Sequence, residues 1–196
     1  WDGEEHVSVT GDLDRTLARG SSFEWADDET FYTLVGDEAR TRVLRCDATE
    51  ADWERTFEAQ GDDRAVAGIS IGGDTAALGL SHPSDGHDAY ALPVEDLHAD
   101  TEPDSLTRLS AVNDELTAEY EMPEVRRVTF ENDGWEISGV LYHPPDYEPG
   151  ESDPLPLVCA IHGGPVSYDE PIFNFDQAAL TSRGYAVFRP NYRGGS

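Results

Sequence analysis

The sequence of 196 residues carries 41 aspartates and glutamates against 13 arginines and no lysine, so its formal net charge is −28. Such an acidic chain repels phosphate backbones, which excludes nucleic acid as an expected partner. No apolar run approaches the ~18 residues that cross a bilayer, so we expect no membrane partner, and two cysteines cannot form a disulfide framework.

The acidic composition has a physical explanation in high salt. At ~1 M salt the Debye length is about 3 Å, so dense surface carboxylates are screened and keep a folded protein hydrated. Four Trp, eight Tyr and seven Phe need a core, which argues against a disordered chain. We therefore expect a cytoplasmic protein of a halophile, with an ordinary acidic mesophilic protein as the alternative. Neither Trp1 nor Ser196 resembles a natural terminus, so we expect a piece of a longer protein.

A loose internal repeat organises the first part of the chain. Residues 23–32 and 41–46 form one predicted unit of strands joined by turns rich in Asp and Gly. Residues 69–78 and 88–94 form a second unit, about 40–46 residues further on. Several strands per unit at this period are typical of β-propeller blades. An unrelated antiparallel meander is the alternative.

Residues 104–120 connect the two parts of the chain. Leu106, Leu109, Val112 and Leu116 fall near helical spacing, which predicts a helix, with an irregular linker as the alternative. Residues 1–124 have a net charge of −23, against −5 for residues 125–196, and Met122-Pro123 marks a plausible boundary. We expect a partial β-propeller over 1–122, of about two to three blades and a junction, and a second domain over 123–196.

The second part predicts a mixture of strands and a helix. Residues 127–131 and 135–142 alternate as strands around an Asn-Asp-Gly turn, which indicates a hairpin. Residues 157–161 are a continuous apolar run, as expected for a strand buried on both faces. A helix over 173–182 and a strand over 185–188 complete a strand–loop–helix–strand unit, which is typical of an α/β parallel sheet. Cys159 in this run and Cys46 in the first part are both expected in the core.

The motif His162-Gly163-Gly164-Pro165 follows the apolar run directly. Open α/β sheets place their active sites at this end of a strand. Two glycines let the backbone approach a ligand closely, and in α/β-hydrolases this loop donates one N–H to the oxyanion hole. A tight Gly-Gly turn with no chemical role is the alternative.

A resemblance to a known family extends beyond the motif His162-Gly163-Gly164-Pro165. Together with residues 183–187 and Asn191-Tyr192-Arg193-Gly194, this motif resembles the start of the catalytic domain in the prolyl oligopeptidase family of serine peptidases. Residues 128–139 resemble the hairpin that opens that domain, and the HGGP spelling is similar to the acylaminoacyl-peptidase and dipeptidyl-peptidase-like branch. The resemblance implies a β-propeller over an α/β-hydrolase domain, with residues 123–196 as its N-terminal part. It implies hydrolysis of short peptides or acyl-peptides through an acyl-enzyme, without a cofactor.

The resemblance also implies roles for individual residues. The Gly164 N–H would be the oxyanion donor, with Gly163 and His162 shaping the same loop. Arg193 would brace the loop or lie on the surface.

The catalytic Ser, Asp and His that the resemblance implies are expected outside this chain. In α/β-hydrolases all three follow the oxyanion loop, and only 31 residues follow Pro165, without a Gly-x-Ser-x-Gly motif. Residues 68–72 match that motif around Ser70, but they precede the oxyanion loop and lead into a predicted strand. We therefore expect the chain alone to be inactive. A propeller-capped esterase and a non-catalytic binding module are the alternatives.

No metal site is expected. His82, His87 and His98 are spaced unlike a helical zinc pair, and the acidic runs lack the spacing of a calcium loop.

Overall fold

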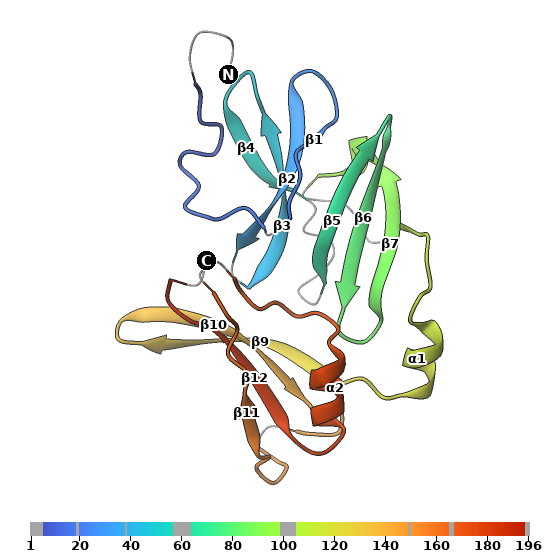
Figure 1. The fold of residues 1–196 in the computed structure, drawn as a ribbon, viewed down its shortest axis with the longest axis vertical. Helices are drawn as coiled ribbons and strands as arrows, with labels where there is room; N and C mark the ends of the chain where they lie inside the picture. The colour runs from blue at the N-terminus through green and yellow to red at the C-terminus, as the bar shows by residue number, and fades with distance from the viewer. Residues whose placement is uncertain are drawn as a thin grey trace.

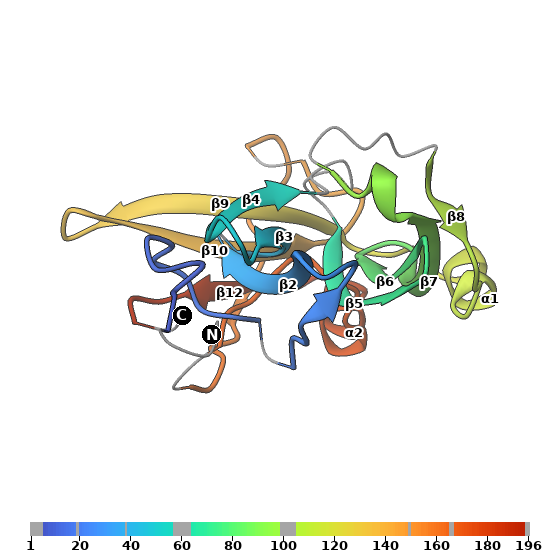
Figure 2. The same cartoon turned by 90° about the horizontal axis from the view of Figure 1, so that it is seen from above.

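The computed structural model describes residues 6–18, 20–37, 39–56, 64–98, 105–148, 150–164 and 167–194. These residues form three four-stranded sheets, with strand orders β1-β2-β3-β4, β5-β6-β7-β8 and β11-β12-β10-β9. In Figure 1 the first two sheets stand side by side above the third, and Figure 2 shows the long β9–β10 hairpin projecting to one side.

The first sheet is an antiparallel meander whose tight turns are stabilised by aspartates. The Asp27 carboxylate accepts hydrogen bonds from the amides of Glu29 (2.8 Å) and Thr30 (2.7 Å), which closes the first turn. Asp47 does the same for the last turn. β2 is buried along its whole length. The strands are β1 (Glu24–Trp25), β2 (Thr30–Asp37), β3 (Arg40–Asp47) and β4 (Asp52–Thr56).

The second sheet repeats this antiparallel order. Gly73, at φ +58°, makes the tight turn between its first two strands. Two successive four-stranded units confirm the expected repeat, and each has one strand more than the sequence pattern predicted. The strands are β5 (Ala65–Gly72), β6 (Thr75–His82), β7 (Gly86–Pro93) and β8 (Thr107–Arg108).

The two sheets share one hydrophobic core. Leu34 and Val43 of the first sheet pack with Val66 and Leu78 of the second, and all four are at most 3% exposed. A short 3-10 turn (Val94–Asp96) leads to Leu97, which is also buried in this core. The carbonyl of Leu97 accepts a 2.8 Å hydrogen bond from the buried Thr56 hydroxyl.

The helix expected over 104–120 is much shorter, because Asp88 holds the preceding residues extended. The Asp88 carboxylate pairs with Arg108 and accepts hydrogen bonds from the Ser110 hydroxyl (2.6 Å) and the Val112 amide (3.1 Å). α1 therefore covers only Asp114–Glu119. Residues 101–104 lie outside the described residues.

The third sheet is mixed. β9 (Glu124–Asn132) and β10 (Trp135–His143) form the predicted hairpin, and its turn residues Asp133 and Gly134 have φ of +54° and +77°. β11 (Leu157–Cys159) runs parallel to β12 (Ala186–Asn191), and α2 (Phe175–Thr181) lies between them in the chain. This confirms the expected strand–loop–helix–strand order. The Asn174 side chain caps the helix by accepting a bond from the Asp176 amide (3.0 Å).

The expectation that residues 157–161 are buried on both faces is wrong for this structure. β11 is an edge strand of its sheet, and the side chains of Leu157 and Ile161 are 60% and 69% exposed. Cys159 is exposed for the same reason, whereas Cys46 is fully buried as expected. Burial raises the pKa of the Cys46 thiol to about 11, so it stays protonated.

No helix among the described residues is long and apolar enough to cross a membrane.

Candidate active-site loop

The Gly-rich loop begins where the parallel pairing of β11 ends. The amide of Ala160 still donates to the carbonyl of Phe188 in β12 (2.9 Å), and the chain then leaves the sheet. His162, Gly163 and Gly164 follow at once, and Pro165 lies outside the described residues. The loop therefore leaves the carboxyl end of a parallel strand, as the sequence predicted.

Tyr192, which follows β12, holds the start of this loop. Its ring stacks on the His162 ring with centroids 4.4 Å apart and an angle of 20° between the planes. Its hydroxyl donates a 3.0 Å hydrogen bond to the His162 carbonyl. The Nδ1 atom of His162 lies 2.9 Å from the Gly163 carbonyl oxygen. Ring stacking and hydrogen bonding thus fix the backbone directly before the two glycines.

The two glycines are open on the side where a side chain would stand. Among the described residues outside its immediate chain neighbours, a Cβ added at Gly163 would meet no atom within 4 Å, and one at Gly164 would meet only the Tyr192 hydroxyl, at 3.5 Å. Both residues are exposed, and neither has the positive φ that favours glycine. Turn geometry therefore does not require glycine here, whereas close approach of a ligand to the backbone would explain it.

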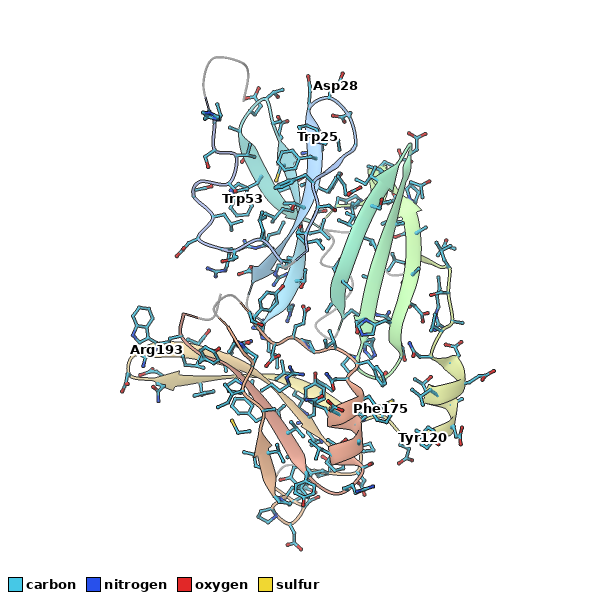
Figure 3. All side chains as sticks on the ribbon, viewed as in Figure 1. Trp25, Asp28, Trp53, Tyr120, Phe175 and Arg193 are labelled. Carbon is cyan, nitrogen blue, oxygen red and sulfur yellow. The ribbon has the colours of Figure 1, made fainter. Side chains whose placement is uncertain are left out.

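Arg193 lies on the surface beside the β9–β10 turn, where Figure 3 labels it. Its guanidinium is 3.6 Å from the Asp133 carboxylate, and the two side chains are 50% and 79% exposed. Solvent screens a pair of this kind, so it contributes little to stability. Arg193, Tyr192 and Tyr168 also line a cavity of about 300 Å³ between the third sheet and the end of β2.

The segment 167–174 continues from the loop toward α2. On the side of the third sheet, Asn191 binds it twice: its Oδ1 accepts from the Asp169 amide (2.6 Å), and its Nδ2 donates to the Asp169 carbonyl (2.8 Å). Arg189 pairs with the buried Asp169 carboxylate at 2.6 Å. The buried Tyr142 hydroxyl donates to the Ile172 carbonyl (3.1 Å), and burial raises its pKa to about 12.

The other side of the segment contacts the first sheet through Thr41 at the start of β3. The Glu170 carboxylate accepts hydrogen bonds from the Thr41 amide (2.7 Å) and the Thr41 hydroxyl (2.9 Å). The same hydroxyl lies 2.7 Å from the Tyr168 hydroxyl. Burial raises the pKa of Glu170 and overcomes the opposing effect of the Thr41 hydrogen bonds.

Sequence reasoning did not find this contact between Thr41 and Glu170. It joins residues 129 apart in the chain, and local periodicity carries no information about such pairs. One signal was present: Gly36, inside the buried strand β2, marks a place where another group approaches the backbone closely. A Cβ added there would lie 2.8 Å from Cζ of Tyr168.

The remaining candidates do not join this site. Ser70 lies within the extended strand β5 and is exposed, so residues 68–72 are not a strand-to-helix elbow. His82 and His87 lie at the two sides of the β6–β7 turn, and in the described part of the chain no three His, Cys, Asp or Glu side chains form a metal-binding group.

Comparison with known proteins identifies the fold. No protein-family model matches the sequence, and no curated protein matches it. Among solved structures, an acylaminoacyl peptidase of Pyrococcus horikoshii matches 99% of this chain with 18% identity and a TM-score of 0.74. A puromycin hydrolase matches 87% with 25% identity and a TM-score of 0.58. A puromycin-hydrolyzing peptidase of Mycobacterium tuberculosis matches 88% with 20% identity and a TM-score of 0.57.

The chain spans only about a quarter of the length of these proteins: 28%, 25% and 26%, respectively. Their likeness shows the fold of the described sheets. It does not by itself assign an activity to this chain.

Proposed function

We propose that the chain is part of a serine peptidase of the prolyl oligopeptidase family, from the acylaminoacyl-peptidase-like branch. Residues 1–122 would be propeller blades and their junction, and residues 123–196 would begin the α/β-hydrolase domain. Two four-stranded antiparallel units followed by a mixed sheet support this order, as does the match of 99% of the chain to an acylaminoacyl peptidase.

The observation that carries the proposal is the loop at the end of β11. Tyr192 fixes its backbone at His162, while Gly163 and Gly164 are open to a ligand. When a nucleophile attacks a substrate carbonyl, negative charge develops on the carbonyl oxygen. The Gly164 N–H would donate to that oxygen, and an already fixed donor needs no reorganisation during the reaction.

The nucleophile, its histidine base and the acid that orients the histidine would come from residues outside this chain. Ser70 lies within the strand Ala65–Gly72 and not at a strand-to-helix turn, which supports a nucleophile elsewhere. The 196 residues alone would therefore be inactive, and the reaction would need no metal or cofactor, because the serine mechanism uses only protein groups.

The substrate would be a short peptide or acyl-peptide, held between the blades and the third sheet. One solved acylaminoacyl peptidase that matches 95% of this chain, with a TM-score of 0.71, is bound to the peptide inhibitor Z-Gly-Gly-Phe-chloromethyl ketone. The composition supports a cytoplasmic protein that works in high salt, with two free cysteines.

The test is hydrolysis by the product of the complete open reading frame that encodes this segment, in ~2 M KCl. We expect release of p-nitroaniline from N-acetyl-alanine p-nitroanilide, and covalent inhibition by Z-Gly-Gly-Phe-chloromethyl ketone. Hydrolysis of p-nitrophenyl acetate without hydrolysis of the anilide would indicate an esterase. Absence of both activities in a folded product would contradict an enzyme and leave a binding module.

A further inference from the structure

The segment 167–173 lies between the two antiparallel sheets and the third sheet, as Figure 1 shows for the chain that enters α2. It is bound from both sides. Asn191 and Tyr142 hold it to the third sheet. Thr41 holds it to the first sheet, and the Ser81 hydroxyl of β6 accepts a 3.3 Å hydrogen bond from the Phe173 amide.

The contact to the first sheet combines hydrogen bonds with the packing of an aromatic ring against the backbone. The amide and the hydroxyl of Thr41 both donate hydrogen bonds to the Glu170 carboxylate, at 2.7 and 2.9 Å. The Tyr168 ring lies against the backbone of β2 at Gly36, where there is no room for a side chain. The Tyr168 hydroxyl completes the arrangement at 2.7 Å from the Thr41 hydroxyl. Thr41 itself is only 3% exposed, so water competes poorly for these bonds.

This contact lies close in the chain to the candidate oxyanion donor. Only three residues separate Gly164 from Tyr168 in the chain, and two of them, Pro165 and Val166, lie outside the described residues. On its other side the loop is fixed by Tyr192 at His162. In the chain, the two glycines thus lie between an anchor on the third sheet, at His162, and an anchor on the first sheet, at Tyr168 and Glu170.

We propose that Thr41 is a positioning residue for the Gly163-Gly164 loop: through Glu170 and Tyr168, the first sheet holds the oxyanion donor in its working position. This rests on the proposed function of that loop. Thr41 does not touch the substrate in this mechanism and acts only through the segment 167–170. Since misplacing a reacting group by ~1 Å can cost 100-fold in rate, loosening this anchor lowers the rate of the chemical step.

The experiment compares three variants of the complete open reading frame product. Thr41→Val keeps the shape of the side chain but removes the hydroxyl, and Thr41→Ser restores the hydroxyl. Thr56→Val is the matched control, because Thr56 is a buried threonine of the same sheet whose hydroxyl bonds to Leu97, away from the segment. We expect Thr41→Val to lower kcat for the anilide about 5- to 50-fold with KM changed less than twofold. Thr41→Ser and Thr56→Val should keep kcat within about twofold.

A second measurement does not depend on activity. Hydrogen–deuterium exchange of the peptide that spans residues 160–170 should become at least threefold faster in Thr41→Val and stay unchanged in Thr56→Val. If the wild-type product lacks hydrolytic activity but this exchange responds, the proposed function fails and the positioning contact stands. Equal effects of Thr41→Val and Thr56→Val on both readouts would overturn the inference, and so would no effect of Thr41→Val on either.

Discussion

The rings of His162 and Tyr192 stack at 4.4 Å while the Tyr192 hydroxyl donates to the His162 carbonyl at 3.0 Å. Tyr192 thus restrains both the ring and the backbone carbonyl of His162. Both contacts lie within the protein, and they restrain the backbone directly before Gly163 and Gly164. In the proposed function, a donor that is fixed in this way would stabilise the oxyanion without reorganising during the reaction.

Replacing Tyr192 by Phe should lower kcat of the complete protein about threefold to tenfold. The change removes the hydrogen bond to His162, worth about 1 kcal/mol, and keeps the ring stacking. Tyr185→Phe is the control, because Tyr185 is exposed to a similar degree, 39% against 37%, and lies before β12. Steady-state kinetics with the anilide measures both, and an equal loss of kcat in the two variants would contradict the account.

Replacing Gly36 by Ala should destabilise the protein by about 1–3 kcal/mol, because the new methyl group would overlap the Tyr168 ring. Gly79→Ala is the matched control. Gly79 also lies inside a strand, β6, but a Cβ there would be 3.6 Å from the nearest atom, so this change should be neutral or stabilise by a few tenths of a kcal/mol. The thermal unfolding midpoints of the two variants, compared with that of the wild type, test this difference. A midpoint for Gly36→Ala at or above that of Gly79→Ala would show that Tyr168 does not pack on β2.

The protein should become less stable in acid, because Asp37 loses its ion pairs when it is protonated. This buried carboxylate pairs with Arg15, with Arg55 at 2.9 Å and with Arg42 at 3.5 Å. Burial alone raises the pKa of Asp37, but the Arg15 hydrogen bond and the three positive charges outweigh it, so the pKa lies below its ordinary value. A lowered pKa means that the stabilisation is present above about pH 4 and is lost as the pH falls through the folded-state value.

Asp37→Asn should therefore lower the free energy of unfolding by about 2 kcal/mol at pH 7, and the difference from wild type should shrink below pH 4. The loss should be smaller than that for a fully buried ion pair, because Arg15 and Arg55 are 40% and 38% exposed. Asp133→Asn, which removes the exposed partner of Arg193, should change stability by less than about 0.5 kcal/mol. The free energies of unfolding of both variants and the wild type, measured between pH 3 and 7, test these expectations. A difference between Asp37→Asn and wild type that grows as the pH falls would contradict the lowered pKa of Asp37.

Salt should stabilise the protein strongly. With 41 acidic residues against 13 arginines, charge repulsion is screened over about 10 Å at ~0.1 M salt and over about 3 Å at ~1 M. We expect the unfolding midpoint to rise by at least 10 °C between 0.1 M and 2 M KCl, and the 196-residue chain to unfold or self-associate at the lower concentration. A monomeric chain that melts cooperatively at the same temperature in both would show that the acidic surface is no adaptation to salt.

Local chemistry made much of the fold predictable. Asn132-Asp133-Gly134 marks a hairpin turn because two successive residues there adopt positive φ. The strands of the first two sheets follow from Asp and Gly turns between β-forming runs. The loop at His162 was predictable because an apolar strand precedes it and a helix follows.

Features that depend on distant residues were not predictable. Leu109 and Val112 have helical spacing, yet the Asp88 carboxylate from β7 holds that stretch extended. Leu157 and Ile161 have the apolarity of a doubly buried strand, but their burial depends on what lies beyond the sheet edge. The Thr41–Glu170 contact joins the first sheet to the segment before α2, across 129 residues, and its only local signal in the sequence is Gly36 in β2.

The measurement that tests the oxyanion role most directly compares Gly164→Pro with Gly164→Ala in the complete protein. Proline removes the backbone N–H, whereas alanine keeps it, and the Tyr192 hydroxyl, at 3.5 Å, is the nearest described atom that the alanine Cβ would meet. We predict that Gly164→Ala keeps kcat within about threefold, and that Gly164→Pro loses ~100- to 1,000-fold with an unchanged unfolding midpoint. Wild-type kcat in a folded Gly164→Pro variant would contradict the role assigned to this amide.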